Sequence, residues 1–243
     1  MTGTFLNVAA ILIGGTLGIV LGGRLPERLR QTVMAGMGLF VLAYGVHMFL
    51  GTKNSLVVLG SLVFGILLGE WWRIEDGIRW MGRWLEMHVM PRGEAVDHLA
   101  RQERFVRGFF TASLLFCVGP IAILGSIQDG LTGDFQLLAV KSVLDGFASL
   151  AFASTLGVGV LFSALPILIY QGAIALAAAQ FQQAVSEAMM TEMTATGGVI
   201  LMAIAVNSLL ELKQIRAGNF LPALFLAPLM VWVLTLLNIP WIF

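Results

Sequence analysis

The sequence FLNVAAILIGGTLGIVLGG, from Phe5 to Gly23, contains no charged residue and approaches the ~20 apolar residues that cross a lipid bilayer. Val33–Leu50 and Leu56–Trp72 have a similar apolar character. No basic residue precedes the first stretch and no small-residue cleavage pattern is evident, so we interpret it as a retained helix and not as a secretory signal. These stretches predict an integral membrane protein.

The overall composition agrees with this interpretation. Of the 243 residues, 58% are hydrophobic and 12% are charged, whereas soluble domains are about one quarter charged. The formal net charge is zero, so the chain shows no nucleic-acid signature. The single cysteine, Cys117, excludes an internal disulfide. We expect residues 1–243 to form one transmembrane domain in contact with membrane lipids, and we predict no cofactor.

The apolar pattern predicts an all-α, polytopic transmembrane helix bundle with about eight spans. The stretch Ser154–Pro166 is the least certain division, because its glycines and proline suit either a tight turn between two helices or a broken helix that lines a cavity. Seven or nine crossings therefore stay open. The eight spans are placed at 5–23, 33–50, 56–72, 108–127, 137–156, 158–179, 196–212 and 219–238.

The charges between the spans predict an orientation. Basic residues gather after the first span, between Arg73 and Arg107, and after the seventh span, so the positive-inside rule places these segments in the cytoplasm. We therefore expect both termini to lie outside. The residues behind this orientation are Arg24, Arg28, Arg30, Lys213 and Arg216 on the inside, against Lys53, Asp129, Asp134, Glu187 and Glu192 in the opposing loops.

The longest cytoplasmic segment, 73–107, contains apolar residues at helical spacing, among them Ile78, Met81 and Leu85. Tryptophans such as Trp80 and Trp84 lie nearby, which is typical of an amphipathic helix at the membrane surface. The segment is either a solvated connector that rests on the membrane or an element that docks a partner or senses lipid.

Two glycine-rich segments suggest an internal repeat. Ile11–Gly22 is faintly similar to Leu115–Gly125, and the two run in opposite directions in the predicted topology. This pattern is compatible with a three-plus-three inverted repeat plus two helices, an arrangement that many transporters use. Chance similarity between glycine-rich apolar runs is the alternative.

The fifth span carries the sharpest functional signal. Lys141, Ser142, Asp145 and Ser149 follow one another at spacings that gather them on one helical face, with Asp145 about 12 Å inside the helix. An ionisable group at membrane depth is costly, so Asp145 is the first candidate for ion or proton binding. The alternative is a structural pair in which Lys141 neutralises Asp145 one turn away.

Other polar residues in or beside the spans extend the candidate substrate or ion site. Their side chains suit either ligand coordination or hydrogen bonding between helices. Pro120 interrupts the fourth span and could free backbone carbonyls, although Asp129-Gly130 is also an ordinary turn signal. Glycines four residues apart, including Gly14, Gly18 and Gly22, indicate close helix packing and are compatible with a homodimer. The added candidates are Gln128, Asp129, Gln171, Asn7 and Asn207.

Several motifs together resemble the bacterial domain-of-unknown-function 554 membrane family. The most specific are Phe116–Gly130 and Lys141–Gly146, and the resemblance spans nearly the whole chain. It implies a multi-pass protein of the bacterial cytoplasmic membrane, described as transport-like, without a reaction or substrate. The other motifs that carry it are Asn7, Gly14-Gly15, Gly65–Glu70, Tyr170–Gly172 and Gly218–Pro222.

The leading functional hypothesis is a small transporter or channel for an unidentified solute or ion, coupled to a cation or proton through Asp145. The second is a membrane scaffold or sensor that acts through residues 73–107. We expect no enzyme, because the chain has no zinc-protease or serine-nucleophile motif and only one deep acid. The three histidines are too dispersed to indicate a metal site.

Overall fold

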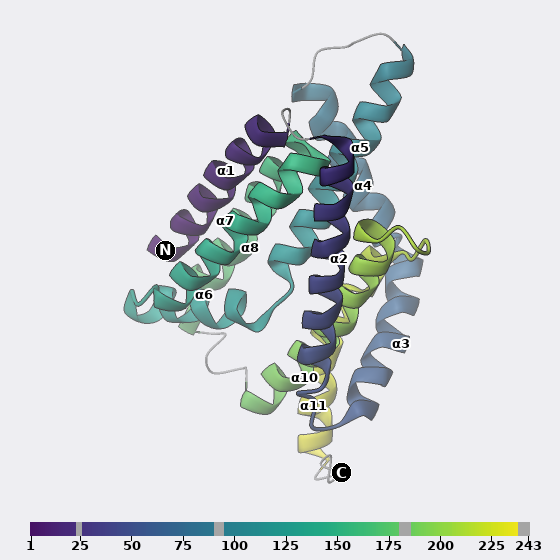
Figure 1. Ribbon diagram of the computed structural model, residues 1–243. Coiled ribbons are helices and arrows are strands. Elements are labelled where there is room, and N and C mark those ends of the chain that lie inside the picture. The colour runs from purple at the N-terminus through teal and green to yellow at the C-terminus, as the bar shows by residue number, and fades with distance from the viewer. Residues whose placement is uncertain (23–25, 90–94, 180–185, 238–243) are drawn as a thin grey trace. The chain divides into compact units, whose positions relative to one another are not determined.

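The computed structural model describes residues 1–22, 26–89, 95–179 and 186–237, and every regular element in these ranges is a helix (Figure 1). The predicted all-α class is therefore confirmed. The chain divides into two compact units. Unit 1 contains Met1–Met37, Gly77–Cys117 and Ile121–Ala179, and unit 2 contains Gly38–Asp76, Val118–Pro120 and Gln180–Phe243. Arg24 and Arg92, which contribute to the predicted orientation, lie outside the described residues.

Helix α2 (Glu27–Phe49) runs from unit 1 into unit 2, and α4 (Ile74–Val89) belongs to unit 1 from Gly77 onward. The remaining helices of unit 1 are α1 (Thr2–Gly22), α5 (Ala95–Cys117), α6 (Pro120–Thr132), α7 (Gln136–Leu156), the 3₁₀ helix η1 (Val158–Ser163) and α8 (Ala164–Leu176). Those of unit 2 are α3 (Ser55–Trp72), α10 (Glu187–Ile204), the π-helical turn η2 (Ala205–Leu209), η3 (Ala217–Phe220) and α11 (Pro222–Leu236).

Within the described residues, six helical stretches are long and apolar enough to cross a membrane, or up to seven if the bent pair α5–α6 forms one span. One of the six is Gln136–Leu176, which the sequence divides into two spans. Asp145 and Gln171 would lie about 39 Å apart along one straight helix, yet both contact Asn7. The chain therefore turns back between them, and Gly157, with a φ of 80°, and η1 provide the turn.

The predicted span 108–127 is not one helix. Helix α5 ends at Cys117, α6 begins at Pro120, and the two helices are bent by 64°. Proline lacks the backbone N–H that a continuous helix needs and disfavours helical geometry in the preceding residue. Gly119 accordingly has a φ of 154°. The break lies inside Leu115–Gly125, whereas Ile11–Gly22 is continuous in α1, so these segments differ in local structure and the inverted repeat stays a prediction.

The described residues of the segment 73–107 form α4 and the first part of α5. Ile78, Met81 and Leu85 of α4 lie on one face, as the spacing predicts, and they pack against Phe105 and Phe109 of α5. The face that the sequence assigns to the membrane surface is therefore covered by protein. The tryptophan side chains Trp80 and Trp84 lie exposed on α4.

Helices α1 and α7 lie side by side in the core of unit 1 (Figure 1). A Cβ atom added at Gly14, Gly18 or Gly22 would overlap backbone atoms of Gly146, Leu150 or Ser154, respectively. The partner number rises by four at each step, so the two helices run parallel, as the eight-span prediction requires of its first and fifth spans. The small-residue stripe on α1 thus packs within the chain.

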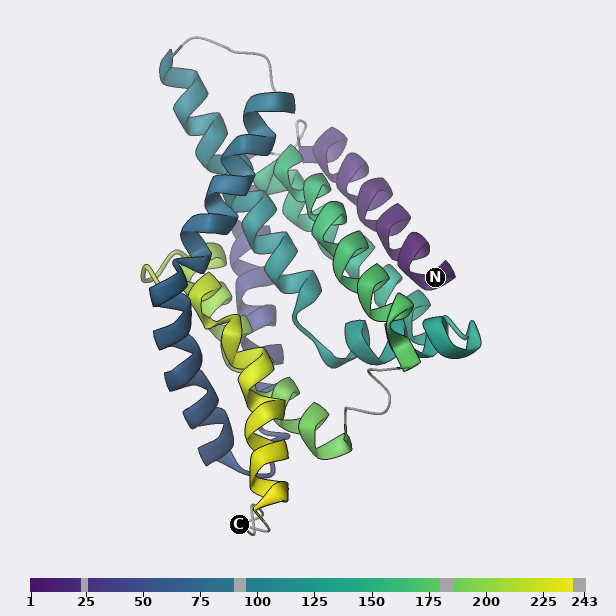
Figure 2. The same cartoon turned by 180° about the vertical axis from the view of Figure 1, so that it is seen from behind.

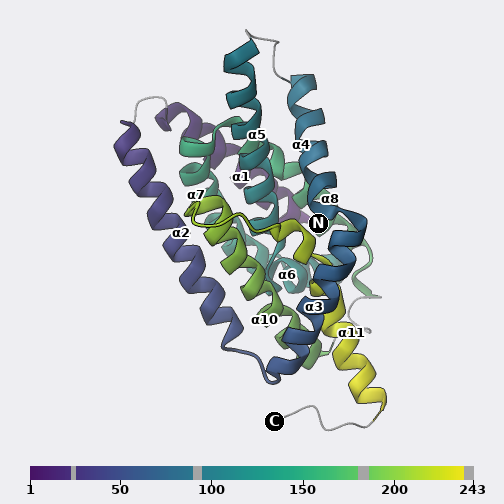
Figure 3. The same cartoon turned by 90° about the vertical axis from the view of Figure 1, so that its right-hand side faces the viewer.

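Unit 2 contains a similar close contact at glycines, but there the two helices run in opposite directions. Gly65 of α3 lies against Ala223 and Gly69 against Asn219, so α3 runs antiparallel to α11. Figure 2 shows the two helices side by side. Figure 3 shows α10 leading through η2 into the loop before η3. Val57, Met189 and Val231 form an apolar core between α3, α10 and α11.

Candidate functional site

A polar cluster lies buried in the core of unit 1, where three helices meet. Helix α1 contributes Asn7, α7 contributes Lys141 and Asp145, and α8 contributes Gln171. Asn7 and Gln171 are fully buried, and Lys141 and Asp145 are each only 7% exposed. The sequence predicted all four as site residues, and the structure brings them together.

Hydrogen bonds connect the four side chains. Asn7 Nδ2 donates to Asp145 Oδ2 at 3.0 Å and to Gln171 Oε1 at 3.4 Å. Lys141 Nζ donates to the same Asp145 Oδ2 and forms an ion pair with it. One carboxylate oxygen thus accepts from both an ammonium and an amide, and the amide links Asp145 to α8.

The close packing of α1 and α7 explains why these groups meet. Asn7, Ile11 and Gly14 belong to the buried face of α1, and Gly14 lies against Gly146, the residue after Asp145. Because no side chain separates the helix backbones there, the short amide of Asn7 can reach the carboxylate of Asp145.

Among the polar atoms of these helices that have no hydrogen-bond partner within the described part of the chain are Asn7 Oδ1, Gln171 Nε2 and Ser149 Oγ. An ionised Asp145 can only accept hydrogen bonds, which directs the amide nitrogen of Asn7 toward it and the oxygen away. A buried polar group without a partner costs about 1–3 kcal/mol. An acceptor, Asn7 Oδ1, and a donor, Gln171 Nε2, therefore lie close to the ion pair without a partner in the described residues.

The broken helix α5–α6 also approaches this cluster. The ammonium of Lys141 lies 5.9 Å from the ring centre of Phe116, within the range of a cation–π contact. Phe116 is the residue before the end of α5. The C-terminal end of a helix carries partial negative charge, which favours a nearby cation. The end of α5 and the carboxylate of Asp145 both act on Lys141.

The structure adds buried hydroxyls that the sequence analysis missed. Thr4 of α1 and Thr111 and Ser113 of α5 are buried in unit 1, and their hydroxyl oxygens have no partner among the residues described. Thr4 lies on the same face as Asn7, three residues earlier, which is a signal that the sequence contains. The two hydroxyls on α5 stand in an apolar run that conceals them.

Asp129, which the sequence also predicted as a site residue, lies at the N-terminus of α1. Its Oδ2 accepts a hydrogen bond from Gly3 N at 3.0 Å, and its Oδ1 lies 3.0 Å from the amino nitrogen of Met1. A carboxylate at a helix N-terminus satisfies free N–H groups and complements the helix dipole. The neighbouring Gln128 is exposed. Neither side chain joins the four-residue cluster.

Two further candidates also have other roles. Ser142 Oγ donates to Leu138 O of its own helix. Asn207 belongs to unit 2, where its Oδ1 accepts from Ile215 N at 3.2 Å and its Nδ2 donates to Ser208 Oγ. Asn207 therefore holds the loop that follows η2.

Unit 2 contains a buried acid that the sequence analysis had assigned to a loop. Glu192 is fully buried in α10. Its carboxylate accepts from Thr52 Oγ1 at 2.6 Å, Lys53 N at 2.7 Å and Asn54 N at 3.1 Å. These bonds satisfy the backbone that enters α3. Within the described residues, no group of three or more His, Cys, Asp or Glu side chains could hold a metal ion.

Comparison of the sequence with known proteins finds a family model and two similar proteins. The family model "Protein of unknown function (DUF554)" matches residues 2–232. The chain is 32% identical over 228 residues to the uncharacterized protein YqgA of Escherichia coli (strain K12), covering 93% of this chain and 94% of that protein. It is 29% identical over 238 residues to the uncharacterized membrane protein YdfK of Bacillus subtilis (strain 168), covering 96% and 97%. No solved structure matches the chain.

Proposed function

This chain belongs to the DUF554 family, and we propose that it is a small transporter or channel of the bacterial cytoplasmic membrane that binds a cation or a proton at Asp145. The observation that carries this proposal is the buried Lys141–Asp145 pair beside the unpartnered oxygen of Asn7 and the unpartnered nitrogen of Gln171. The proposal involves no chemical step and needs no second copy of the chain.

Helix packing alone does not require an ion pair in this place. An ionisable group at the bilayer centre costs about 2.5–3.5 kcal/mol even on the mildest scale, and replacing a buried ion pair with apolar residues is often neutral or stabilising. The pair is nevertheless connected to three helices through Asn7. A role in ion binding accounts for both its position and its connections.

The geometry supports a competition for one carboxylate. Lys141 donates to Asp145 Oδ2, and a cation or proton that binds the Asp145 carboxylate competes with the ammonium and releases it. Asn7 donates to the same oxygen and to Gln171, so a change at Asp145 reaches α1 and α8 directly. A ligand can shift a conformational equilibrium only through such differential contacts. Asn7 is therefore the link through which occupancy of Asp145 changes helix packing.

The break between α5 and α6 is a second observation that supports transport. Transporters often build ion and substrate sites where membrane helices are interrupted, because helix ends offer partial charges and unpaired backbone groups there. Helix α5 ends one residue after Phe116, whose ring lies beside the Lys141 ammonium. When Lys141 leaves Asp145, the end of α5 provides a favourable place for its charge.

The test is ion flux through purified protein in liposomes under imposed pH and alkali-cation gradients. We expect wild type to conduct protons or one of the cations and Asp145→Asn to lose this flux. Asp134→Asn is the matched control, because Asp134 is exposed and its capping bond to Gln136 N needs only the oxygen that asparagine retains. Absence of flux in wild type beside an active control transporter, or undiminished flux in Asp145→Asn, contradicts the proposal.

The scaffold hypothesis predicts a different pattern in cells. If residues 73–107 dock a partner, substitutions on the exposed face of α4, such as Trp84→Ala, abolish function while Asp145→Asn leaves it intact. The apolar face of α4 packs on α5 in this structure, which leaves only the opposite face for a partner. This is why we place transport first.

A further inference from the structure

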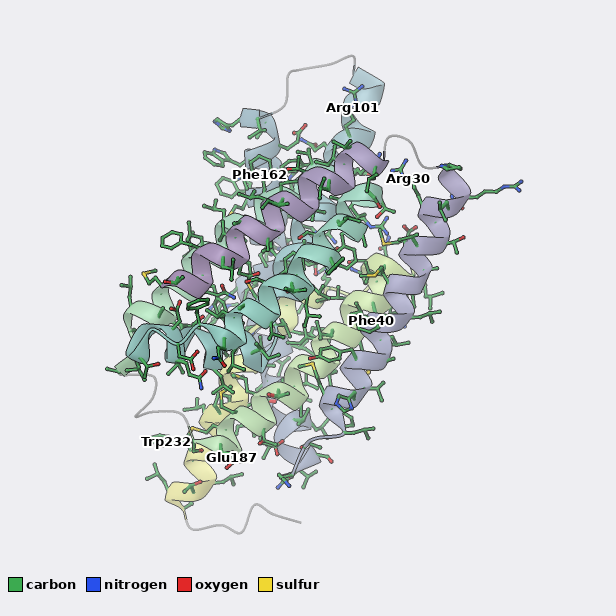
Figure 4. All side chains as sticks on the ribbon, turned by 60° about the vertical axis from the view of Figure 1, so that its left-hand side comes forward. Arg30, Phe40, Arg101, Phe162, Glu187 and Trp232 are labelled. Atoms are coloured by element: carbon green, nitrogen blue, oxygen red, sulfur yellow. The ribbon has the colours of Figure 1, made fainter. Side chains whose placement is uncertain are left out.

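Unit 1 contains a second feature, a cavity of about 290 Å³ near the end of α7. Three arginines line it, Arg30 of α2 and Arg101 and Arg104 of α5. Figure 4 shows Arg30 and Arg101 near one another at one end of this unit. The volume is many times the ~30 Å³ that one water molecule occupies, so a small oxyanion fits inside.

A backbone carbonyl holds two of these arginines in place. Thr155 O accepts from Arg30 Nη2 at 3.0 Å and from Arg104 Nε at 2.9 Å and Nη2 at 2.5 Å. Thr155 is in the last turn of α7, and Gly157 follows the helix. The guanidinium groups are therefore positioned before any ligand arrives.

Arg104 retains donors for a ligand. A guanidinium group carries five N–H donors in a fixed plane, and the two atoms that bond Thr155 O use only part of them. Planar guanidinium groups bind phosphate through paired hydrogen bonds, and such charge-assisted bonds are stronger than neutral ones. A helix C-terminus offers only about half a negative charge, so the end of α7 does not neutralise Arg104 by itself.

Apolar side chains also line the cavity. Ile19 of α1, Phe105 of α5 and Val158 of η1 contribute to it. The cavity lies between the ends of two apolar helices, since Gly22 and Leu156 are the last residues of α1 and α7 and both line it. This end carries the arginines that predict the cytoplasmic side. A lining of arginines together with aliphatic and aromatic groups suits a molecule that joins a phosphate to a hydrocarbon chain.

We propose that this cavity binds a phosphate group, supplied by the headgroup of an anionic phospholipid from the cytoplasmic leaflet. Basic pockets between membrane helices on the cytoplasmic side are known to take such headgroups. Free inorganic phosphate presents the same oxygens and is the other possible source. This site is separate from the Asp145 cluster, and its test does not depend on ion flux.

The experiment measures thermal unfolding of the full chain in a non-ionic detergent with added phosphatidylglycerol, phosphatidylcholine or inorganic phosphate. A ligand that binds only the folded state raises Tm as its concentration rises. We expect phosphatidylglycerol to raise the Tm of wild type at concentrations where phosphatidylcholine has no effect. If inorganic phosphate alone raises the Tm, or competes with the lipid, the site also binds free phosphate. If inorganic phosphate leaves the Tm unchanged, the site binds the lipid.

Arginine variants locate the effect. In Arg101→Gln we expect the half-saturating lipid concentration to rise about tenfold, because one charge-assisted contact is lost. The Tm of each variant with lipid is compared with the Tm of the same variant without lipid. The matched control is Arg28→Gln, an exposed arginine two residues from Arg30 that does not line the cavity. Equal effects of the two lipids, no response to either lipid or phosphate, or an Arg101→Gln response identical to wild type overturns the proposal. The comparison of the two lipids on wild type tests the proposal even if a variant does not fold.

Discussion

The amide nitrogen of Asn7 and the carboxylate oxygen Oδ2 of Asp145, on the parallel helices α1 and α7, lie 3.0 Å apart in the core of unit 1. The same oxygen accepts from Lys141, so the ion pair and the contact between helices depend on one atom. Any change in the charge of Asp145 therefore alters both the pairing within α7 and the link to α1.

The first prediction concerns the stability of this pair. Lys141→Met leaves Asp145 buried without its ammonium partner, and breaking a buried pair in this way costs about 3–5 kcal/mol. The double variant Lys141→Met with Asp145→Leu removes both charges, so we expect its Tm to lie closer to wild type than that of Lys141→Met. Thermal unfolding in detergent measures the order. A double variant less stable than the single one would show that the two side chains do not act as a pair.

The second prediction concerns the packing of α1 on α7. In Gly18→Ala the added methyl would overlap the carbonyl of Leu150, and such overpacking costs about 1–3 kcal/mol. Gly36→Ala in α2 is the control, because no atom lies within 4 Å of the added carbon and alanine favours the helix. We expect a lower Tm for the first and an unchanged or higher Tm for the second. Equal stability of the two variants would argue against the close α1–α7 contact.

The third prediction separates Asp129 from its neighbour. Asp129→Ala removes the acceptor for Gly3 N, and loss of such a cap costs about 1 kcal/mol. Gln128→Ala changes an exposed side chain, so its unfolding should resemble wild type. Hydrogen exchange in the first turn of α1 checks the location, since this turn should exchange faster in Asp129→Ala alone. Equal exchange in both variants would contradict the capping role.

The fourth prediction tests the buried acid of unit 2. Glu192→Met leaves Lys53 N and Asn54 N without their acceptor, at about 1–3 kcal/mol for a buried unsatisfied group. Glu192→Gln keeps an oxygen for the two amides and should recover most of the lost Tm. Glu187→Met, at an exposed position in the same helix, controls for the substitution itself. If Glu192→Gln is as unstable as Glu192→Met, the carboxylate has a role beyond these hydrogen bonds.

The fifth prediction concerns orientation in the membrane. In a Cys117→Ala background, we expect the variant Lys53→Cys to react with a membrane-impermeant maleimide in intact cells. A cysteine at Lys213 should react only after the membrane is permeabilised, because basic loops stay inside. Labelling of both positions from the same side would invalidate the predicted topology.

Much of this protein is determined locally along the sequence. The length of the apolar stretches predicts the spans, and Pro120 predicts the break between α5 and α6. The spacing of Lys141 and Asp145 predicts an ion pair within one helix. These features depend on residues fewer than about five positions apart or on the composition of one helix, because helical periodicity fixes which neighbours share a face.

Only the tertiary structure decides which polar residues from different helices meet. Asn7 and Gln171 join Asp145, whereas Asp129 caps α1, Gln128 is exposed and Asn207 holds a loop in unit 2. The amphipathic face of α4 likewise packs on Phe105 and Phe109 rather than facing a membrane surface. The physical reason is that a helix sequence specifies its own polar face, but the partner of that face depends on where two backbones can approach, here where Gly14 of α1 lies against Gly146 of α7.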